Sequence, residues 1–258
     1  MMPVCPYSAS VKKNLRTYQL AELNWLEFKR IVPAKVDAVL LPVGTVEAHG
    51  VTGLGTDNQI PESIAARIAL RVNALVAPTI AYGITKTLLP YPGSLTVSSE
   101  TFERYVFEVA AGLADTGFRR IVLLNGHGGN TETLKNISSR LYREKKAFSM
   151  VIDWWPLCAE EIRQIYGHIG GHGGTDETAL ILADHPADVR KTDYRKDLAF
   201  TVRPGLAATP FPGSIILYEK DQGYPEFDPA KAERLMTLVA DKVTATIAEV
   251  FSRWAKIG

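Results

Sequence analysis

Hydrophobic and polar positions alternate between two patterns along the chain. Short, nearly continuous apolar runs are typical of strands buried on both faces, and apolar residues spaced three or four apart are typical of helices. The first pattern predicts strands over 36–44, 74–82, 119–125 and 147–155. The second predicts helices over 20–31, 61–73, 100–117, 131–146, 157–167, 176–185 and 229–257.

The regular alternation of strands and helices predicts an α/β fold with a mostly parallel sheet covered by helices on both faces. We find no internal repeat and no linker, so residues 1–258 are expected to form a single domain after an irregular, polar segment at 1–16. In such sheets, ligands bind at the carboxyl ends of the strands.

Three connecting segments stand out from this pattern. Residues 45–59 are loop-like, 83–98 form a long loop with two prolines and two glycines, and 193–228 are expected to be irregular. A loop as long as 83–98 in a compact domain is usually functional.

Composition narrows the functional classes. With 29 Lys and Arg against 28 Asp and Glu, the chain has a net charge of +1, which argues against a nucleic-acid partner. The two cysteines, Cys5 and Cys158, form no CxxC pair, as expected in a reducing compartment. We find neither a leader pattern nor an apolar run long enough to span a bilayer. The sequence therefore predicts a cytoplasmic protein without a membrane partner.

Candidate chemistry falls in three clusters near predicted strand ends or helix starts. They are Glu47, His49 and Asp57; His127 within Asn125–Asn130; and His172 with Asp176 and Glu177. Imidazole and carboxylate are the ligands of Zn²⁺, Mn²⁺ or Fe²⁺. Glu47 and His49 are alternate residues that project to one side of an extended segment. A carboxylate such as Asp57 can bridge two ions.

Each cluster alone also has a structural explanation. A Glu-x-His pair is common, and the glycines around His127 would suit a tight turn or an anion nest at a helix N-terminus. Asp176 and Glu177 would complement a helix dipole, and Trp154 and Trp155 would suit a core or an interface. The coincidence of the three clusters is what favours a site.

Four segments, in this order and spacing, resemble the creatininase (creatinine amidohydrolase) family over residues 17–255. They are LPVGTVEAHG with GTDNQIPESIA, YPGSLTVSSETF, RRIVLLNGHGGN and GGHGGTDETAL. The resemblance implies a three-layer α/β/α sandwich with a binuclear metal centre. It further implies hydrolysis of C–N bonds in a small-molecule substrate, often a cyclic amide, and a homo-oligomer, typically a hexamer.

Carried over position by position, Glu47, His49, Asp57 and His127 match the family's metal ligands, with Asp57 as the bridge. His172 matches its catalytic histidine, and Glu177, at the Glu of the same family segment, is assigned to catalysis as well. The chain departs from creatininase itself at Gly129, where that enzyme has a metal-binding Glu, and in a 47–57 loop that is one residue shorter. We therefore expect Glu177 to supply the missing ligand in a member distinct from creatininase.

The resulting hypothesis places two ions of Zn, Mn or Fe in one centre. Glu47, Asp57 and His127 would hold one ion; His49, Asp57 and Glu177 would hold the other. A hydroxide bridging the ions would attack the substrate carbonyl, and His172 would pass a proton to the leaving nitrogen. Residues assigned to the substrate are Trp154, Trp155, Gly128 and Gly129.

Three alternatives stay open at this point. The same centre could hydrolyse a lactone, a cyclic diketone or a peptide bond, because it activates water without regard to the leaving group. The chain could instead be a non-enzymatic protein that binds an anion or nucleotide, although it lacks GxGxxG and Walker motifs. It could also be a degenerate member with structural metal only.

Overall fold

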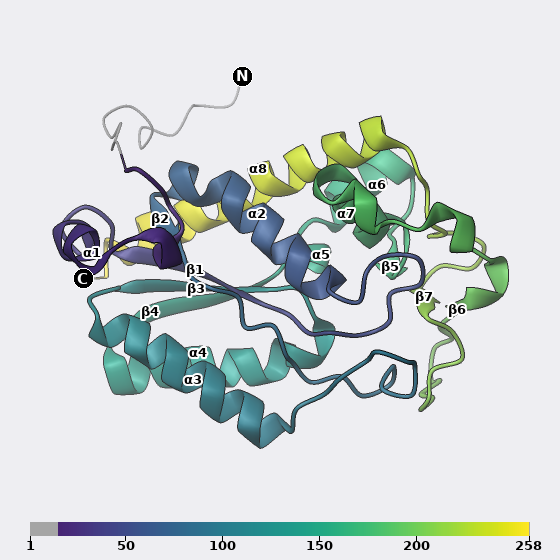
Figure 1. The fold of residues 1–258 in the computed structure, drawn as a ribbon, viewed down its shortest axis with the longest axis horizontal. Helices are drawn as coiled ribbons and strands as arrows, with labels where there is room; N and C mark the ends of the chain where they lie inside the picture. Colours follow the sequence, from purple (N-terminus) through teal and green to yellow (C-terminus); the bar gives the residue numbers. More distant parts are fainter. Residues whose placement is uncertain (1–14, 258) are drawn as a thin grey trace.

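The main sheet is parallel throughout. The computed structural model describes residues 15–257, and its four-stranded sheet has the order β2-β1-β3-β4 (Figure 1). The strands are β1 (Ala38–Val43), β2 (Ala74–Val76), β3 (Arg120–Asn125) and β4 (Phe148–Asp153). Their parallel register, with Val39 opposite Ile121, requires a crossover between successive strands.

Helices cover both faces of this sheet, as Figure 1 shows, and confirm the three-layer α/β/α fold. One layer contains α2 (Thr56–Val72), α5 (Trp154–Leu157), α6 (Ala159–Tyr166), α7 (Thr175–Asp184) and α8 (Pro229–Trp254). The other contains α3 (Ser99–Asp115) and α4 (Thr131–Lys145), with α1 (Trp25–Ile31) at one end. Alternate residues of β1 enter the two cores: Leu40 packs with α2 and α8, and Leu41 with α3 and α4.

Three predicted boundaries are wrong by five residues or more. The helix predicted over 20–31 is a 3₁₀ turn, Leu20–Glu22, followed by α1, because the Asn24 side chain caps α1 by accepting from Leu26 and Glu27. The second strand ends at Val76 rather than 82. Helix α2 begins at Thr56 rather than Pro61, and this places Asp57 in its first turn.

A second, three-stranded sheet was not expected. Strands β5 (Gly171–His172), β7 (Ile215–Leu217) and β6 (Ala199–Thr201) pair in the order β5-β7-β6, so the segment 193–228 is partly ordered as strand. Short 3₁₀ turns also lie between the larger elements, at Gly128–Asn130, Pro186–Asp188, Lys191–Asp193 and Lys196–Leu198. Leu88, Phe211 and Ile216 form a separate small core that joins this sheet to the 83–98 loop.

Three further predictions concern the N-terminal segment, the cysteines and membrane spans. The irregular segment predicted at 1–16 lies outside the described residues except for Leu15 and Arg16, and Cys5 lies outside them as well. Cys158 is a free, buried thiol. None of the helices within 15–257 has the length and apolarity needed to cross a membrane.

Candidate metal centre

The structure brings all six predicted metal-site and catalytic residues together at the carboxyl end of the main sheet. Glu47 and His49 follow β1, Asp57 is in the first turn of α2, His127 follows β3, His172 is in β5, and Glu177 is in the first turn of α7. They surround a cavity of about 310 Å³, and of the six only His49 does not line its wall. His49 is buried behind Asp57.

Two glycines allow helix α2 to start directly against the strand ends. A Cβ built at Gly44 would lie 2.3 Å from the Asp57 carbonyl oxygen, and one built at Gly126 would lie 2.0 Å from it. Pro61, four residues after Asp57, has no N–H to donate to that carbonyl. These glycines, one after β1 and one after β3, therefore let the Asp57 side chain reach both neighbouring clusters.

Asp57 is shared by two sets of ligand atoms. The first set is Glu47, Asp57 and His127; the second is His49, Asp57 and Glu177; and within each set the ligand atoms lie within 4.8 Å of one another. Asp57 Oδ1 is 2.8 Å from His49 Nε2. Asp57 Oδ2 is buried and forms an ion pair with His127 Nδ1 at 2.9 Å, although not in the geometry of a hydrogen bond. A buried carboxylate oxygen that is not engaged in a hydrogen bond of good geometry can bind a cation.

A backbone carbonyl fixes the ring of each histidine in the site. A carbonyl oxygen can only accept, so the nitrogen facing it carries the proton. His127 Nε2 donates to Ile84 O at 3.0 Å, His49 Nδ1 to Glu47 O at 3.0 Å, and His172 Nε2 to Ala48 O at 2.7 Å. The opposite nitrogen of each ring therefore faces the carboxylates. Histidines that ligate a metal are usually oriented in this way, by a hydrogen bond from the second ring nitrogen to a fixed acceptor.

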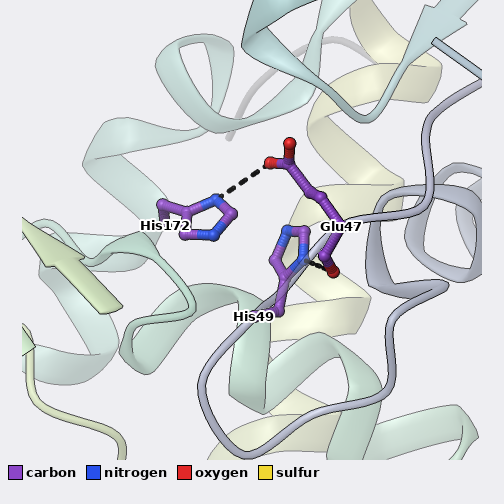
Figure 2. A group of neighbouring side chains, drawn as sticks. All are labelled: Glu47, His49 and His172. Atoms are coloured by element: carbon purple, nitrogen blue, oxygen red, sulfur yellow. Dashed lines mark hydrogen bonds and ion pairs between the residues drawn. The ribbon is translucent and has the colours of Figure 1, made fainter. Parts of the chain in front are cut away.

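His172 lies next to Glu47 and His49, one member of each set, as Figure 2 shows. Its Nδ1 is 3.5 Å from Glu47 Oε1, and its ring centre is 4.0 Å from that of His49. Glu47, His49 and His172 also form a third possible ligand set. The geometry thus allows His172 either to ligate an ion or to exchange a proton next to one.

The carboxylates shift the ionisation of the buried groups strongly. Burial alone would lower the pKa of His49, but Asp57 and Glu177 outweigh it and raise that pKa to about 10. The pKa of His127 rises to about 9 against burial because of Asp57. Despite burial, the histidines hold the pKa of Asp57 well below its usual range. Burial, reinforced by the charge on Asp57, raises the pKa of Glu177 to about 8.

These donors fit divalent metal ions. Five buried or nearly buried imidazole and carboxylate groups converge, and Asp57 carries an oxygen without a hydrogen bond. In the metal-free protein, protons occupy the lone pairs of His49 and His127 that face the carboxylates. Metal ions compete with protons for such lone pairs.

Metal uptake is accordingly expected to release protons. At pH 7.5 the groups with pKa values of about 10, 9 and 8 (His49, His127 and Glu177) carry protons. Saturation with Zn²⁺ should therefore displace roughly two to three protons per chain, and apparent affinity should rise with pH up to about 10. Titration in weak buffer with a pH indicator measures this number. Release of fewer than about one proton would contradict the ligand assignment.

The packing around Gly129 explains why no carboxylate ligand is found at this position. A Cβ there would lie 2.2 Å from Ile84 O and 2.5 Å from His127 Nε2. The His127 ring and the carbonyl that orients it already fill the space that a side chain would need. Glu177, whose Oε2 accepts from the Gly173 N–H at 2.6 Å and lies 3.7 Å from His49 Nε2, reaches the site from α7.

We expect Gly129→Ala to destabilise the protein. The added methyl must displace His127 or the 83–98 loop, at a cost of about 1–3 kcal/mol in the free energy of unfolding. Urea denaturation of chelator-treated protein measures this cost. Gly128→Ala is the matched control, because its Cβ would meet nothing closer than Trp155 at 3.8 Å. Equal stability of the two variants would contradict the steric account.

The cavity walls only partly match the sequence prediction. Gly128, Gly129 and Trp155 line the cavity. Trp154 does not: its ring is fully buried in the core with α2 and α8. The assignment of Trp154 to the substrate is therefore wrong. Trp154, the first residue of α5, points into the core, and Trp155, the second, lines the cavity.

Sequence reasoning missed several residues of the wall. Lys86, Thr87 and Leu88 enter it from the long 83–98 loop, and Ile216 and Tyr218 from β7 and the residue after it. The length of the 83–98 loop was a signal that it lines a site, although it identified no residue. The 193–228 segment gave no comparable signal, since its strands are three residues long.

Comparison with known proteins agrees with this architecture. The family model described as creatinine amidohydrolase (creatininase) matches residues 21–247. Creatinine amidohydrolase of Pseudomonas putida is 30% identical over 223 residues, which cover 76% of this chain and 85% of that protein. A mycofactocin precursor peptide peptidase of Mycobacterium tuberculosis is 29% identical over 177 residues, covering 64% of this chain and 65% of the peptidase.

Solved structures agree as well. A crystal structure of creatinine amidohydrolase superposes with a TM-score of 0.81 at 25% identity, covering 92% of this chain and 99% of the other. A manganese form of creatininase gives a TM-score of 0.76 at 25% identity, covering 91% and 99%. A creatininase variant of Zn-Zn type gives 0.78 at 26% identity, covering 91% and 98%. The family match over most of the chain, with the fold and the site described above, shows that this protein belongs to the creatininase family of hydrolases.

Proposed function

We propose that this protein is a hydrolase that uses two divalent metal ions to cleave the C–N bond of an amide, with small cyclic amides as the first substrate class. The observation that carries the proposal is the pair of ligand sets that share Asp57 beside one cavity. Glu47, Asp57 and His127 would hold one ion. His49, Asp57 and Glu177 would hold the other. Zn and Mn are the first candidates, since related creatininases have been solved with them.

When bound, such ions polarise a carbonyl and lower the pKa of a coordinated water to near neutrality. The chain itself supplies orientation and proton transfer. The carbonyls of Ile84 and Glu47 hold His127 and His49 with their free nitrogens inward. The apolar side chains of Ile84, Leu88 and Ile216 contribute apolar surface to the cavity wall.

His172 is the proposed proton carrier. Burial, reinforced by the charge of His49, lowers its pKa to about 3 in the metal-free protein, so the ring is neutral near pH 7. Its Nε2 proton is held by Ala48 O, which leaves the Nδ1 lone pair toward Glu47. Such a histidine first accepts a proton at Nδ1 and can then donate it to the leaving nitrogen.

A peptide bond is the second candidate substrate. The similarity to a mycofactocin precursor peptide peptidase supports it, and the same ligand sets would serve either carbonyl. The cavity volume of about 310 Å³ favours the small molecule, because it is at the small end of ligand pockets. Lactones and cyclic diketones complete the set to be tested.

Metal analysis is the first test of the proposal. Protein purified without chelator or a nickel column should contain about two equivalents of Zn, Mn or Fe per chain. It should hydrolyse at least one member of a panel of cyclic amides, dipeptides and lactones. Absence of metal, with none taken up from added Zn²⁺ or Mn²⁺, would overturn the proposal and favour an anion-binding protein.

The assembly and location also stay predictions. The family resemblance predicts a homo-oligomer, with a hexamer as the specific form, which sedimentation measures directly. The low cysteine content, with no CxxC pair, predicts a cytoplasmic protein.

A further inference from the structure

Lys86 is the only lysine or arginine among the described residues that line the cavity. Its side chain is exposed and forms no ion pair with any residue in 15–257. Four carboxylates, those of Glu47, Asp57, Asp176 and Glu177, line the same cavity. An unpaired ammonium at a cavity wall is free to bind a charged group of a ligand.

The backbone around Lys86 is held in place. Two residues before it, Ile84 N–H donates to Asn130 Oδ1 at 3.0 Å. Directly after it, the Thr87 carbonyl accepts from Phe211 N–H at 3.0 Å, which ties the loop to the small sheet. The ammonium is therefore presented from a fixed segment, and this reduces the ordering cost of binding.

The charge balance of the cavity indicates what Lys86 would recognise. Two divalent cations would offset the charges of the four carboxylates, with the histidines neutral and before the coordinated water loses a proton. Lys86 then leaves one uncompensated positive charge. A single ammonium matches a monoanion, whereas a phosphate dianion usually engages several donors. The remaining wall, with Trp155, Ile216 and Tyr218, suits a flat or apolar body.

We propose that the substrate carries a carboxylate, and that Lys86 is the residue that selects it by pairing with this group. This inference rests on the proposed function, because the charge balance includes the two metal ions. It narrows the substrate class from cyclic or peptide amides in general to those that also carry a carboxylate within reach of Lys86.

A matched pair of ligands tests the proposal. Metal-loaded protein is titrated with pyroglutamate and with 2-pyrrolidinone, which share the lactam ring and differ in the carboxylate. We follow binding by calorimetry and by tryptophan fluorescence, since Trp155 lines the cavity. Lys86→Met should weaken pyroglutamate about tenfold, a value between those of exposed and buried charged contacts. It should leave 2-pyrrolidinone unchanged, and the difference should shrink as salt is added.

Lys29→Met, which removes an exposed lysine on α1, is the control and should change neither affinity. Unchanged binding of pyroglutamate by Lys86→Met, equal weakening of both ligands, or no binding of pyroglutamate to the wild-type protein would overturn the proposal. A larger loss for inorganic phosphate would overturn the assignment to a carboxylate. Lys86-dependent binding without turnover of any amide would contradict the proposed function alone.

Discussion

Replacing Asp57 with asparagine is expected to leave the protein with almost no bound metal and to reduce turnover more than about 100-fold. Loss of a residue that only supports a ligand costs about 10- to 100-fold, and Asp57 belongs to both ligand sets. Its two oxygens lie 2.8 Å from His49 Nε2 and 2.9 Å from His127 Nδ1. An amide offers one oxygen and no charge. Metal content measured by elemental analysis and turnover measured on the same sample test this expectation.

Two further variants separate loss of the bridge from loss of the fold. Glu177→Gln affects one ligand set only, so it should lose about one of two ions. Asp176→Asn is the matched control: it is also a buried carboxylate in the first turn of a helix, but it belongs to no ligand set. Its Oδ1 accepts from Gly171 N–H, which an amide oxygen can continue to do. Retention of two ions by Asp57→Asn would show that Asp57 is not a ligand.

Loss of the Asp57 charge should lower the stability of the metal-free protein only slightly. The pKa values of His49 and His127 are raised, against burial, by Asp57. Without that charge both rings can lose their protons near neutral pH, so they do not remain as unpaired buried cations. Thermal unfolding of the chelator-treated variant should therefore resemble that of Asp176→Asn. If Asp57→Asn is folded but contains no metal, the loss of metal is due to the loss of a ligand and not to unfolding.

The sequence was sufficient to predict the sheet and the place of the site. Buried strands have an apolar pattern that does not depend on distant contacts, and parallel strands end at the same edge. Glu47 and His127 follow neighbouring strands, β1 and β3, so their proximity could be expected from strand order alone. The start of α2 could not, because Pro61 resembles a first-turn proline and the packing of Gly44 on Asp57 is a tertiary contact.

The remaining features depend on contacts between distant segments. The carbonyl of Ala48 that orients His172 lies 124 positions earlier in the chain. Strands β5 and β7 are two and three residues long, too short to show periodicity. Trp154 and Trp155 are adjacent in sequence, so only the turn into α5 decides which one faces the cavity. No local pattern contains this information.

For Glu177, the sequence resemblance and the packing in the structure lead to the same expectation. Its role as a ligand was predicted because Gly129 replaces an expected carboxylate, an argument from the resemblance alone. The structure supplies a physical reason, since the His127 ring and Ile84 O leave no room for a side chain at Gly129. The Glu177 carboxylate, from α7, lies 3.7 Å from His49 Nε2. The proposed centre keeps its number of carboxylates while drawing one from a different element.

Replacing His172 with glutamine or alanine should lower turnover by about 10²- to 10⁴-fold while the metal content stays at about two ions per chain. The ring donates to Ala48 O and approaches Glu47 Oε1, an atom of the first ligand set, but His172 itself belongs to neither of the two sets that share Asp57. Glutamine can still donate to Ala48 O but cannot carry a proton. A small molecule with a good leaving group, which needs no protonation, should be hydrolysed by the variants almost as fast as by the wild-type protein.

His168→Gln is the control for this experiment. His168 lies four residues earlier and outside the cavity wall, where its Nδ1 contacts only the Ile169 carbonyl among the hydrogen bonds formed within 15–257. Turnover and metal content should both be unchanged in it. Loss of one ion from His172→Gln would instead make His172 a ligand, through the third set with Glu47 and His49. Unchanged turnover would remove His172 from the reaction and point to Glu177, whose pKa is raised to about 8 and which also lines the cavity, for proton transfer to the leaving nitrogen.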